Sequence, residues 1–134
     1  MTIVVDASVA AKWVLPEDGA DRAAALRNEA EGFLAPSLIY AEIGNAVRKR
    51  AQWNELSKAD ALRALESAIG LFDALVPMAE LAGRATEIAI DLGHPIYDCF
   101  YLALAERERI PLVTADDRLM AKVKRLKGLT IRKL

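Results

Sequence analysis

The sequence predicts an α/β fold in which helices connect the strands of a parallel sheet. Short apolar runs alternate along the chain with longer segments rich in Ala, Leu and charged residues, a pattern typical of layered α/β proteins. The chain has 134 residues, the length of one domain, so we expect a single domain over residues 1–134. It is 54% hydrophobic with a net charge of −1, which excludes the disordered class.

Composition also indicates the cellular compartment in which the protein is expected. The sequence has one cysteine, Cys99, which excludes a disulfide framework and a cysteine-based zinc site. No apolar run approaches the roughly 18 residues that cross a bilayer. The first six residues lack a basic region and end at the carboxylate of Asp6, unlike a signal peptide. We therefore expect a soluble cytoplasmic protein with no membrane partner.

The first elements are one strand and two helices. Residues 3–5 are apolar and β-branched, which favours a buried strand. Residues 8–15 predict a short helix that Pro16 stops. Residues 18–31 are rich in strong helix formers, and we expect Gly32 to end that helix.

Two strands and two helices are predicted next. The strands are short apolar runs beside a proline, over residues 33–35 and 75–77, and the second is expected at a sheet edge because proline is tolerated there. A serine N-cap is expected to open each helix, over residues 37–52 and 57–72. The second of these serines also has the capping-box spacing, with Asp in place of Glu.

The remaining chain predicts three helices and two strands. A helix over residues 79–92 is followed by glycine, and a proline opens the next helix, over residues 95–109. An apolar strand over residues 110–114 leads into a helix over residues 116–126, and residues 129–131 form a last strand.

The end of the chain is basic although the whole chain is nearly neutral. Residues 118–134 contain seven basic side chains and no acid. They are Arg118, Lys122, Lys124, Arg125, Lys127, Arg132 and Lys133. We interpret them mainly as a solvated helix and tail, with a polyanion-binding edge as the alternative.

Four carboxylates occur in unusual places. Asp6 directly follows an apolar strand, and Asp116 comes two residues after another. Glu42 and Asp98 lie early in predicted helices with largely apolar neighbours. Because ligands of open parallel sheets gather beyond the carboxyl ends of the strands, we expect all four on one edge.

Each of these acids also has a structural interpretation when taken alone. The helix dipole could stabilise Asp98 in the first turn of its helix, and Asp116 could cap the next helix. Asp6 could close a turn, and Glu42 could pair with a nearby cation. Four like charges on one edge would repel one another, however, and half-buried carboxylates need a counter-charge. Oxygen donors without a Cys or His cluster suit Mg²⁺ or Mn²⁺.

Four segments carry a more specific pattern. In chain order they are VVDASVAAKW (4–13), PSLIYAEIGNA (36–46), YDCFYLALA (97–105) and LVTADDRL (112–119). Together they resemble the PIN-domain ribonucleases, specifically the VapC-type toxins of toxin–antitoxin pairs. The resemblance implies a central five-stranded parallel sheet flanked by helices on both faces.

The resemblance also implies a function and a site. The function is that of a Mg²⁺- or Mn²⁺-dependent endoribonuclease that acts on RNA and is held inactive by a cognate antitoxin protein. It also implies a homodimer. The residues that match the family's acidic set are Asp6, Glu42, Asp98 and Asp116, as catalytic and metal-binding residues.

Neighbouring residues match the same pattern. Ser8 and Thr114 match its hydroxyl residues and are expected to support or hydrate the metal. Asp117 leaves the position of the last acid open by one residue, and we prefer Asp116 because the family pattern is Thr-x-Asp. The apolar surface of the helices over residues 38–71 is expected to receive the antitoxin or a second copy.

Other residues receive structural interpretations. We expect Cys99 to be a small buried apolar residue, His94 a loop residue, and Tyr101 part of a core or dimer interface.

Two alternative functions stay open from the sequence. A receiver-type Mg²⁺-binding signalling domain would need two adjacent acids after the first strand, where Asp6 stands alone. A catalytically inactive PIN module that binds RNA or protein would not need the full acidic set.

Overall fold

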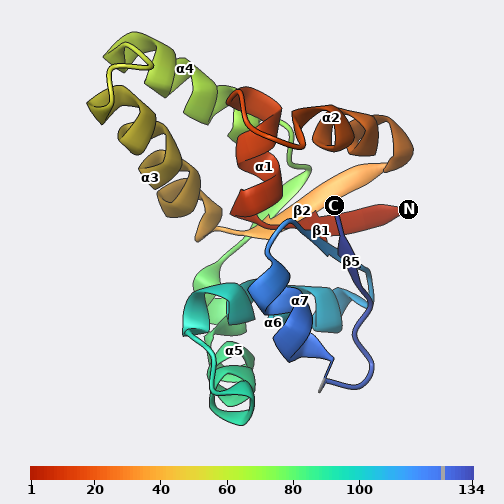
Figure 1. Ribbon diagram of the computed structural model, residues 1–134. Helices are drawn as coiled ribbons and strands as arrows, with labels where there is room; N and C mark the ends of the chain where they lie inside the picture. Colours follow the sequence, from red (N-terminus) through yellow and green to blue (C-terminus); the bar gives the residue numbers. More distant parts are fainter. Residues whose placement is uncertain (125) are drawn as a thin grey trace.

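A five-stranded sheet with every strand parallel forms the middle layer of the molecule (Figure 1). The computed structural model describes residues 1–124 and 126–134. The strand order is β3-β2-β1-β4-β5. The strands are β1 (Thr2–Val5), β2 (Gly32–Pro36), β3 (Ala74–Val76), β4 (Leu112–Thr114) and β5 (Ile131–Lys133). The predicted α/β class, the number of strands and the edge position of the proline-bounded strand are confirmed. The last strand, predicted over residues 129–131, begins only at Ile131.

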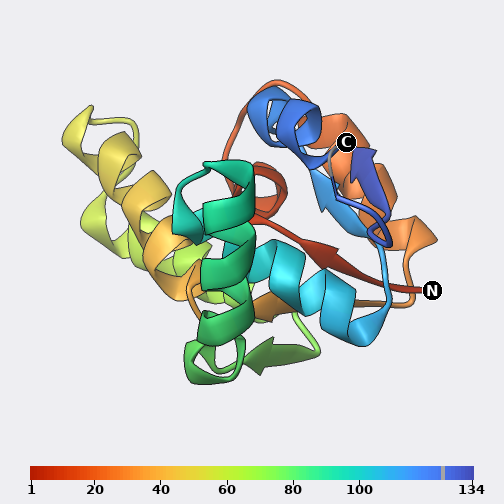
Figure 2. The ribbon, with the colours of Figure 1, turned by 90° about the horizontal axis from the view of Figure 1, so that it is seen from below.

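Helices cover both faces of this sheet. Figures 1 and 2 show α1 and α2 on one face and α5, α6 and α7 on the other, while α3 and α4 form a hairpin that projects to one side. The helices are α1 (Ala7–Val14), α2 (Ala20–Glu29), α3 (Ile39–Gln52), α4 (Lys58–Ile69), α5 (Met78–Leu92), α6 (Ile96–Glu108) and α7 (Asp117–Val123).

The strand order creates a switch point between β1 and β4. The chain moves outward from β1 through β2 to β3, and then returns to the other side of β1 to form β4 and β5. The connections that leave β1 and β4 therefore diverge at their carboxyl ends, and such switch points are where open α/β sheets bind ligands.

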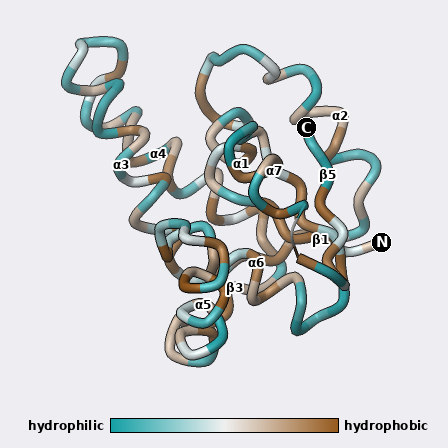
Figure 3. The backbone as a smooth tube through the Cα atoms, turned by 60° about the horizontal axis from the view of Figure 1, so that its bottom comes forward, coloured by the Kyte–Doolittle hydropathy of each residue, from teal (hydrophilic) through white to brown (hydrophobic). Residues whose placement is uncertain are grey.

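The core is built around β1 and α6. Residues 99–105 of α6 are all buried, so this helix is apolar on every side and lies between the sheet and α5. In Figure 3 the hydrophobic segments gather along β1 and α6, and hydrophilic segments lie toward the outside. Asp98 is thus a polar residue at the entrance of a fully buried helix.

Several predicted boundaries are corrected. Gly32 does not end a helix but begins β2, because α2 already stops at Glu29. Ser37 is not the N-cap of α3; its hydroxyl accepts a hydrogen bond from the backbone N–H of Met78, at the start of α5.

Two helices are also shorter than predicted. α4 ends at Ile69 and α7 at Val123, three residues before the expected end of each. Arg125, one of the seven basic side chains near the end of the chain, lies outside the described residues.

No helix in the described part of the chain is long and apolar enough to cross a membrane.

Candidate active site

Asp6 lies at the centre of the switch point. It follows β1 and forms the N-cap of α1, where its Oδ1 accepts the N–H of Val9 at 3.3 Å. The hydroxyl of Ser8 donates to Oδ1 at 2.5 Å, and the hydroxyl of Thr114, at the end of β4, donates to Oδ2. Asp6 is only 4% exposed, and this burial raises its pKa to about 6 even though the three hydrogen bonds lower it.

Glu42 lies in the first turn of α3, which follows β2. The buried hydroxyl of Tyr101, on α6, donates to Glu42 Oε1 at 2.6 Å. Burial raises the pKa of Glu42, and the negative charges of Asp98 and Asp6 raise it further. The structure therefore brings Asp6, Glu42 and Asp98 close enough together to influence one another's ionisation.

Asp98 begins the buried helix α6. Its Oδ2 lies 2.7 Å from Nε2 of His94, four residues earlier in the chain. His94 is thus a loop residue, as predicted, but its side chain is only 8% exposed and contacts the acidic site.

Asp116 lies at the same edge of the sheet, and its carboxylate accepts two backbone hydrogen bonds. It is the N-cap of α7, and its Oδ1 accepts the N–H groups of Arg118 at 2.8 Å and Leu119 at 3.4 Å. Its own N–H donates to the Thr114 hydroxyl at 3.0 Å, so this single hydroxyl connects Asp116 to Asp6. Asp116 therefore caps a helix, as its structural interpretation predicts, and it also lies at the edge of the sheet where the other acids are found.

Asp117 points elsewhere. Its side chain is 90% exposed and pairs with Lys133 of β5 at 2.7 Å. Lys133 also donates to the carbonyl of Ala115, so the loop that carries both acids is anchored to the last strand. This arrangement favours Asp116 over Asp117 as the member of the site.

All four acids lie at helix N-termini. Asp6 and Asp116 are N-caps, while Glu42 and Asp98 lie in first turns. The N-terminus of a helix carries a partial positive charge of roughly half a unit, which stabilises a nearby carboxylate. These helix ends partly offset the repulsion among the acids.

Sequence reasoning missed two of the side chains that hold the acids. Tyr101 was assigned to packing alone, and His94 was given no contact with the site. Tyr101 lies three residues after Asp98 on α6, so the two side chains share a face of that helix, and this spacing was a signal available in the sequence. His94 precedes the helix, and no helical spacing predicts its contact with Asp98.

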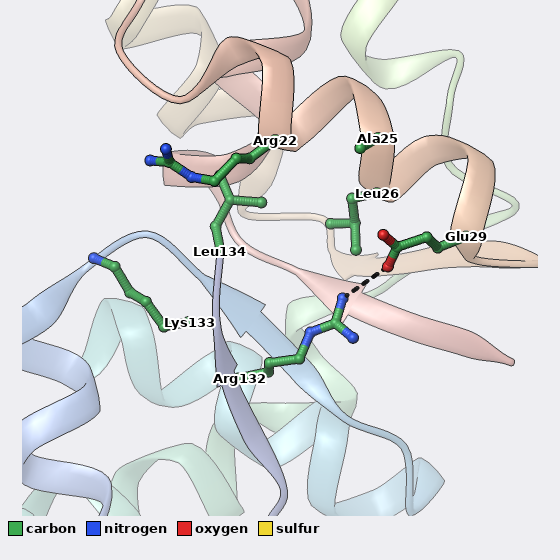
Figure 4. Close-up of a pocket in the computed structure, with 7 residues that line it drawn as sticks. All are labelled: Arg22, Ala25, Leu26, Glu29, Arg132, Lys133 and Leu134. Carbon is green, nitrogen blue, oxygen red and sulfur yellow. Dashed lines mark ion pairs between the residues drawn. The ribbon is translucent and has the colours of Figure 1, made fainter.

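The basic end of the chain is partly engaged in internal contacts. Lys122 donates to the carbonyl of Gly93 at 2.9 Å, and Arg132 pairs with Glu29 at 3.6 Å. Figure 4 shows the Arg132–Glu29 pair in a hollow between α2 and β5, away from the acids. This supports the structural interpretation of Lys122, Arg132 and Lys133.

The donor set suits a hard divalent cation. Asp6, Glu42 and Asp98 supply carboxylate oxygens, and no Lys or Arg forms an ion pair with them among the described residues. Within those residues, no three His, Cys, Asp or Glu side chains converge closely enough to hold an ion as they stand. The chemistry fits Mg²⁺ or Mn²⁺, and the side chains would have to draw together around the ion.

Comparison with known proteins identifies relatives over nearly the whole chain. The model of the PIN domain family matches residues 3–126. Ribonuclease VapC9 of Mycobacterium tuberculosis is 39% identical over 117 residues, which cover 87% of each chain. Among solved structures, PAE2754 from Pyrobaculum aerophilum is 29% identical with a TM-score of 0.67, covering 98% of this chain and 92% of that one.

A further structural neighbour is a complex. VapBC-5 from Mycobacterium tuberculosis, described as a member of the VapBC family of toxin–antitoxin systems, has a TM-score of 0.64 and 21% identity, covering 99% of this chain and 98% of that one. At that identity the match shows the fold alone.

Proposed function

Because this chain belongs to the PIN domain family, we propose that it is an endoribonuclease toxin that hydrolyses RNA phosphodiester bonds with carboxylate-bound Mg²⁺ or Mn²⁺. The observation that carries the proposal is the placement of Asp6, Glu42 and Asp98 at the helix N-termini beside the switch point, near enough for the charges of Asp98 and Asp6 to raise the pKa of Glu42, in a PIN fold whose relatives are named ribonucleases. Family membership also excludes the receiver-type alternative.

We assign the four acids different roles in binding metal and orienting water. Asp6, Asp98 and Asp116 would hold the main ion, and Glu42 would hold a second ion or orient the attacking water. A bound Mg²⁺ or Mn²⁺ supplies a water that ionises near neutral pH and offsets charge on the phosphate. In-line attack would leave a 5′-phosphate and a 3′-hydroxyl.

Neighbouring residues prepare these acids for the reaction. Ser8 and Thr114 hold both oxygens of Asp6, which fixes the rotation of its carboxylate. The Tyr101 hydroxyl donates a hydrogen bond to Oε1 of Glu42 and not to its Oε2. The raised pKa of Glu42 makes it a better proton acceptor for an attacking water.

Metal removal tests this function. We expect EDTA to abolish cleavage of RNA by the purified, partner-free protein, and either Mg²⁺ or Mn²⁺ to restore it. Asp98→Asn should remain inactive at any metal concentration, which serves as the matched control. Equal cleavage in EDTA, or full activity of Asp98→Asn, would contradict the proposal.

We place the antitoxin in the groove between α3 and α4. This hollow of about 300 Å³ is lined by apolar side chains, among them Val47, Ala61, Leu62 and Leu65, together with the cationic residues Arg48 and Lys58. Leu62 is 56% exposed, so the groove presents apolar surface that a partner helix could cover. A basic side chain of the same partner would reach Asp6 and Asp98 in place of the metal.

Two further parts of the proposal concern setting and assembly. We propose that the protein acts in the cytoplasm, where its RNA substrate is. Association of two copies of the chain stays a prediction.

A further inference from the structure

His94 is the single histidine of the sequence and lies immediately outside the proposed metal ligands. Its side chain is 8% exposed, and its Nε2 lies 2.7 Å from Oδ2 of Asp98. Its other ring nitrogen, Nδ1, is buried and has no hydrogen-bond partner among the described residues. A carboxylate can only accept a hydrogen bond, so this contact is a hydrogen bond when the imidazole carries its hydrogen on Nε2.

The segment that carries His94 is held from three directions. Gly93 ends α5 in the left-handed conformation with φ of 59°, which a side chain would strain. The N–H of His94 donates to the carbonyl of Ala89 at 3.1 Å. Lys122 of α7 donates to the carbonyl of Gly93 at 2.9 Å. The imidazole therefore approaches Asp98 from a fixed backbone.

This contact leaves the two oxygens of Asp98 unequal. Oδ2 accepts from the imidazole, and Oδ1 has no hydrogen-bond partner among the described residues. The side chain of Asp98 is 27% exposed, and the imidazole is its hydrogen-bond partner among the described residues. An imidazole N–H that holds one oxygen of a carboxylate restricts that rotation before a ligand arrives.

We propose that His94 is a positioning residue that orients Asp98 for divalent metal binding by donating its Nε2–H to Oδ2. The inference rests on the proposed metal site and deepens it, since it adds a hydrogen-bond donor that acts through a ligand. Hydrogen-bond partners of metal ligands commonly contribute tenfold to a hundredfold to metal affinity. His94 acts in this way from the end of α5, an element that contributes no acid to the site.

Direct binding of Mn²⁺ tests this role without using catalysis. Free Mn²⁺ is followed by electron paramagnetic resonance during titration of the partner-free protein, with no RNA present. We expect His94→Phe, which lacks a donor, to weaken Mn²⁺ affinity about tenfold. His94→Gln can place an amide N–H near the position of Nε2 and should stay within about threefold of the wild type.

A third variant separates the hydrogen bond from the mere presence of a polar side chain. The amide of His94→Asn reaches only the position of Nδ1, so this variant should bind Mn²⁺ as weakly as His94→Phe. Melting temperatures of the metal-free variants serve as the check on folding. Rescue by Gln but not by Asn is an outcome that a purely structural role of His94 would not produce.

The hydrogen position can be read independently of metal. Because the chain has one histidine, a long-range proton–nitrogen NMR spectrum of the metal-free protein contains one imidazole. We expect the hydrogen on Nε2, and a hydrogen on Nδ1 alone would overturn the proposal.

The binding outcomes distinguish this inference from the proposed function. If the wild type binds Mn²⁺ and Asp98→Asn weakens binding while His94→Phe does not, the role of His94 is overturned and the metal site stands. If the wild type binds no Mn²⁺, the proposed metal site fails and the role of His94 fails with it.

Discussion

Asp6 is a buried carboxylate, and its burial disfavours the ionised form. Burial raises its pKa from 3.8 to about 6, so ionised Asp6 costs about 3 kcal/mol of stability at neutral pH. We expect Asp6→Asn to stabilise the metal-free protein by about 1–3 kcal/mol, because asparagine removes the charge and still caps α1. The same change should lower RNA cleavage by about a hundredfold or more, since it alters a proposed metal ligand.

Denaturant unfolding in EDTA measures the first effect, and cleavage of a labelled RNA measures the second. An Asp6→Asn variant that is less stable than the wild type, while keeping its cleavage, would show that Asp6 is a structural cap and not a metal ligand.

The adjacent acids Asp116 and Asp117 provide an internal comparison. Asp116 is joined to Asp6 through the Thr114 hydroxyl, whereas Asp117 pairs with Lys133 at the surface. We therefore expect Asp116→Asn to reduce cleavage severely and Asp117→Asn to reduce it less than about threefold. Asparagine is as good a helix cap as aspartate, so α7 should persist in both variants. The reverse order of severity would move the last acid of the site to Asp117.

At the scale of elements, the α3–α4 hairpin is the segment best suited to a partner. We expect Leu62→Asp to weaken antitoxin binding at least about tenfold, because a buried unpaired carboxylate costs more than 1.4 kcal/mol. The exposed position of Leu62 should leave the stability of the free protein nearly unchanged. Calorimetric titration with the purified antitoxin measures the affinity, and a thermal melt of the free variant checks the folding.

A second exposed apolar residue serves as the control. Ile90, on α5, is 75% exposed and lies outside the groove. Ile90→Asp should therefore bind the antitoxin like the wild type. If Ile90→Asp weakens the complex and Leu62→Asp does not, the partner covers α5 instead of the hairpin.

At the scale of the whole molecule, the acidic site predicts how stability depends on pH and metal. The pKa values of Asp6 and Glu42 are raised in the folded protein, so between about pH 4 and pH 6 the folded state binds more protons than the unfolded chain. The stability contributed by these groups is therefore lost as pH rises through that range. We expect the metal-free protein to melt at a higher temperature at pH 5 than at pH 7.

Saturating Mg²⁺ or Mn²⁺ should reverse this trend, because the ion binds the ionised carboxylates of the folded state. The lowered pKa values of Asp60 and Glu106 act in the opposite direction, but their ion pairs with arginines are exposed and contribute little. Thermal melts at both pH values, with EDTA and with metal, measure the effect. A metal-free protein that is more stable at pH 7 would argue against a buried ionised cluster.

The sequence by itself determined the strands, the parallel α/β class and the helix that enters the core at Asp98. These follow from local patterns: β-branched runs such as residues 3–5, breakers such as Pro16, and the apolar stretch 99–105. It also placed Asp6 and Asp116 at one edge of the sheet, because parallel strands end on the same side. The metal-binding roles of the acids stay predictions.

Only the tertiary structure decided which groups hydrogen-bond across the site. Ser37 contacts Met78 and not its own helix, and Tyr101 holds Glu42, a residue 59 positions earlier in the chain. His94 meets Asp98 across the turn between α5 and α6, where Lys122 of α7 donates to the carbonyl of Gly93. The Ser37–Met78, Tyr101–Glu42 and Lys122–Gly93 contacts join segments remote in sequence, and each polar group takes whichever partner the packed fold brings within about 3 Å.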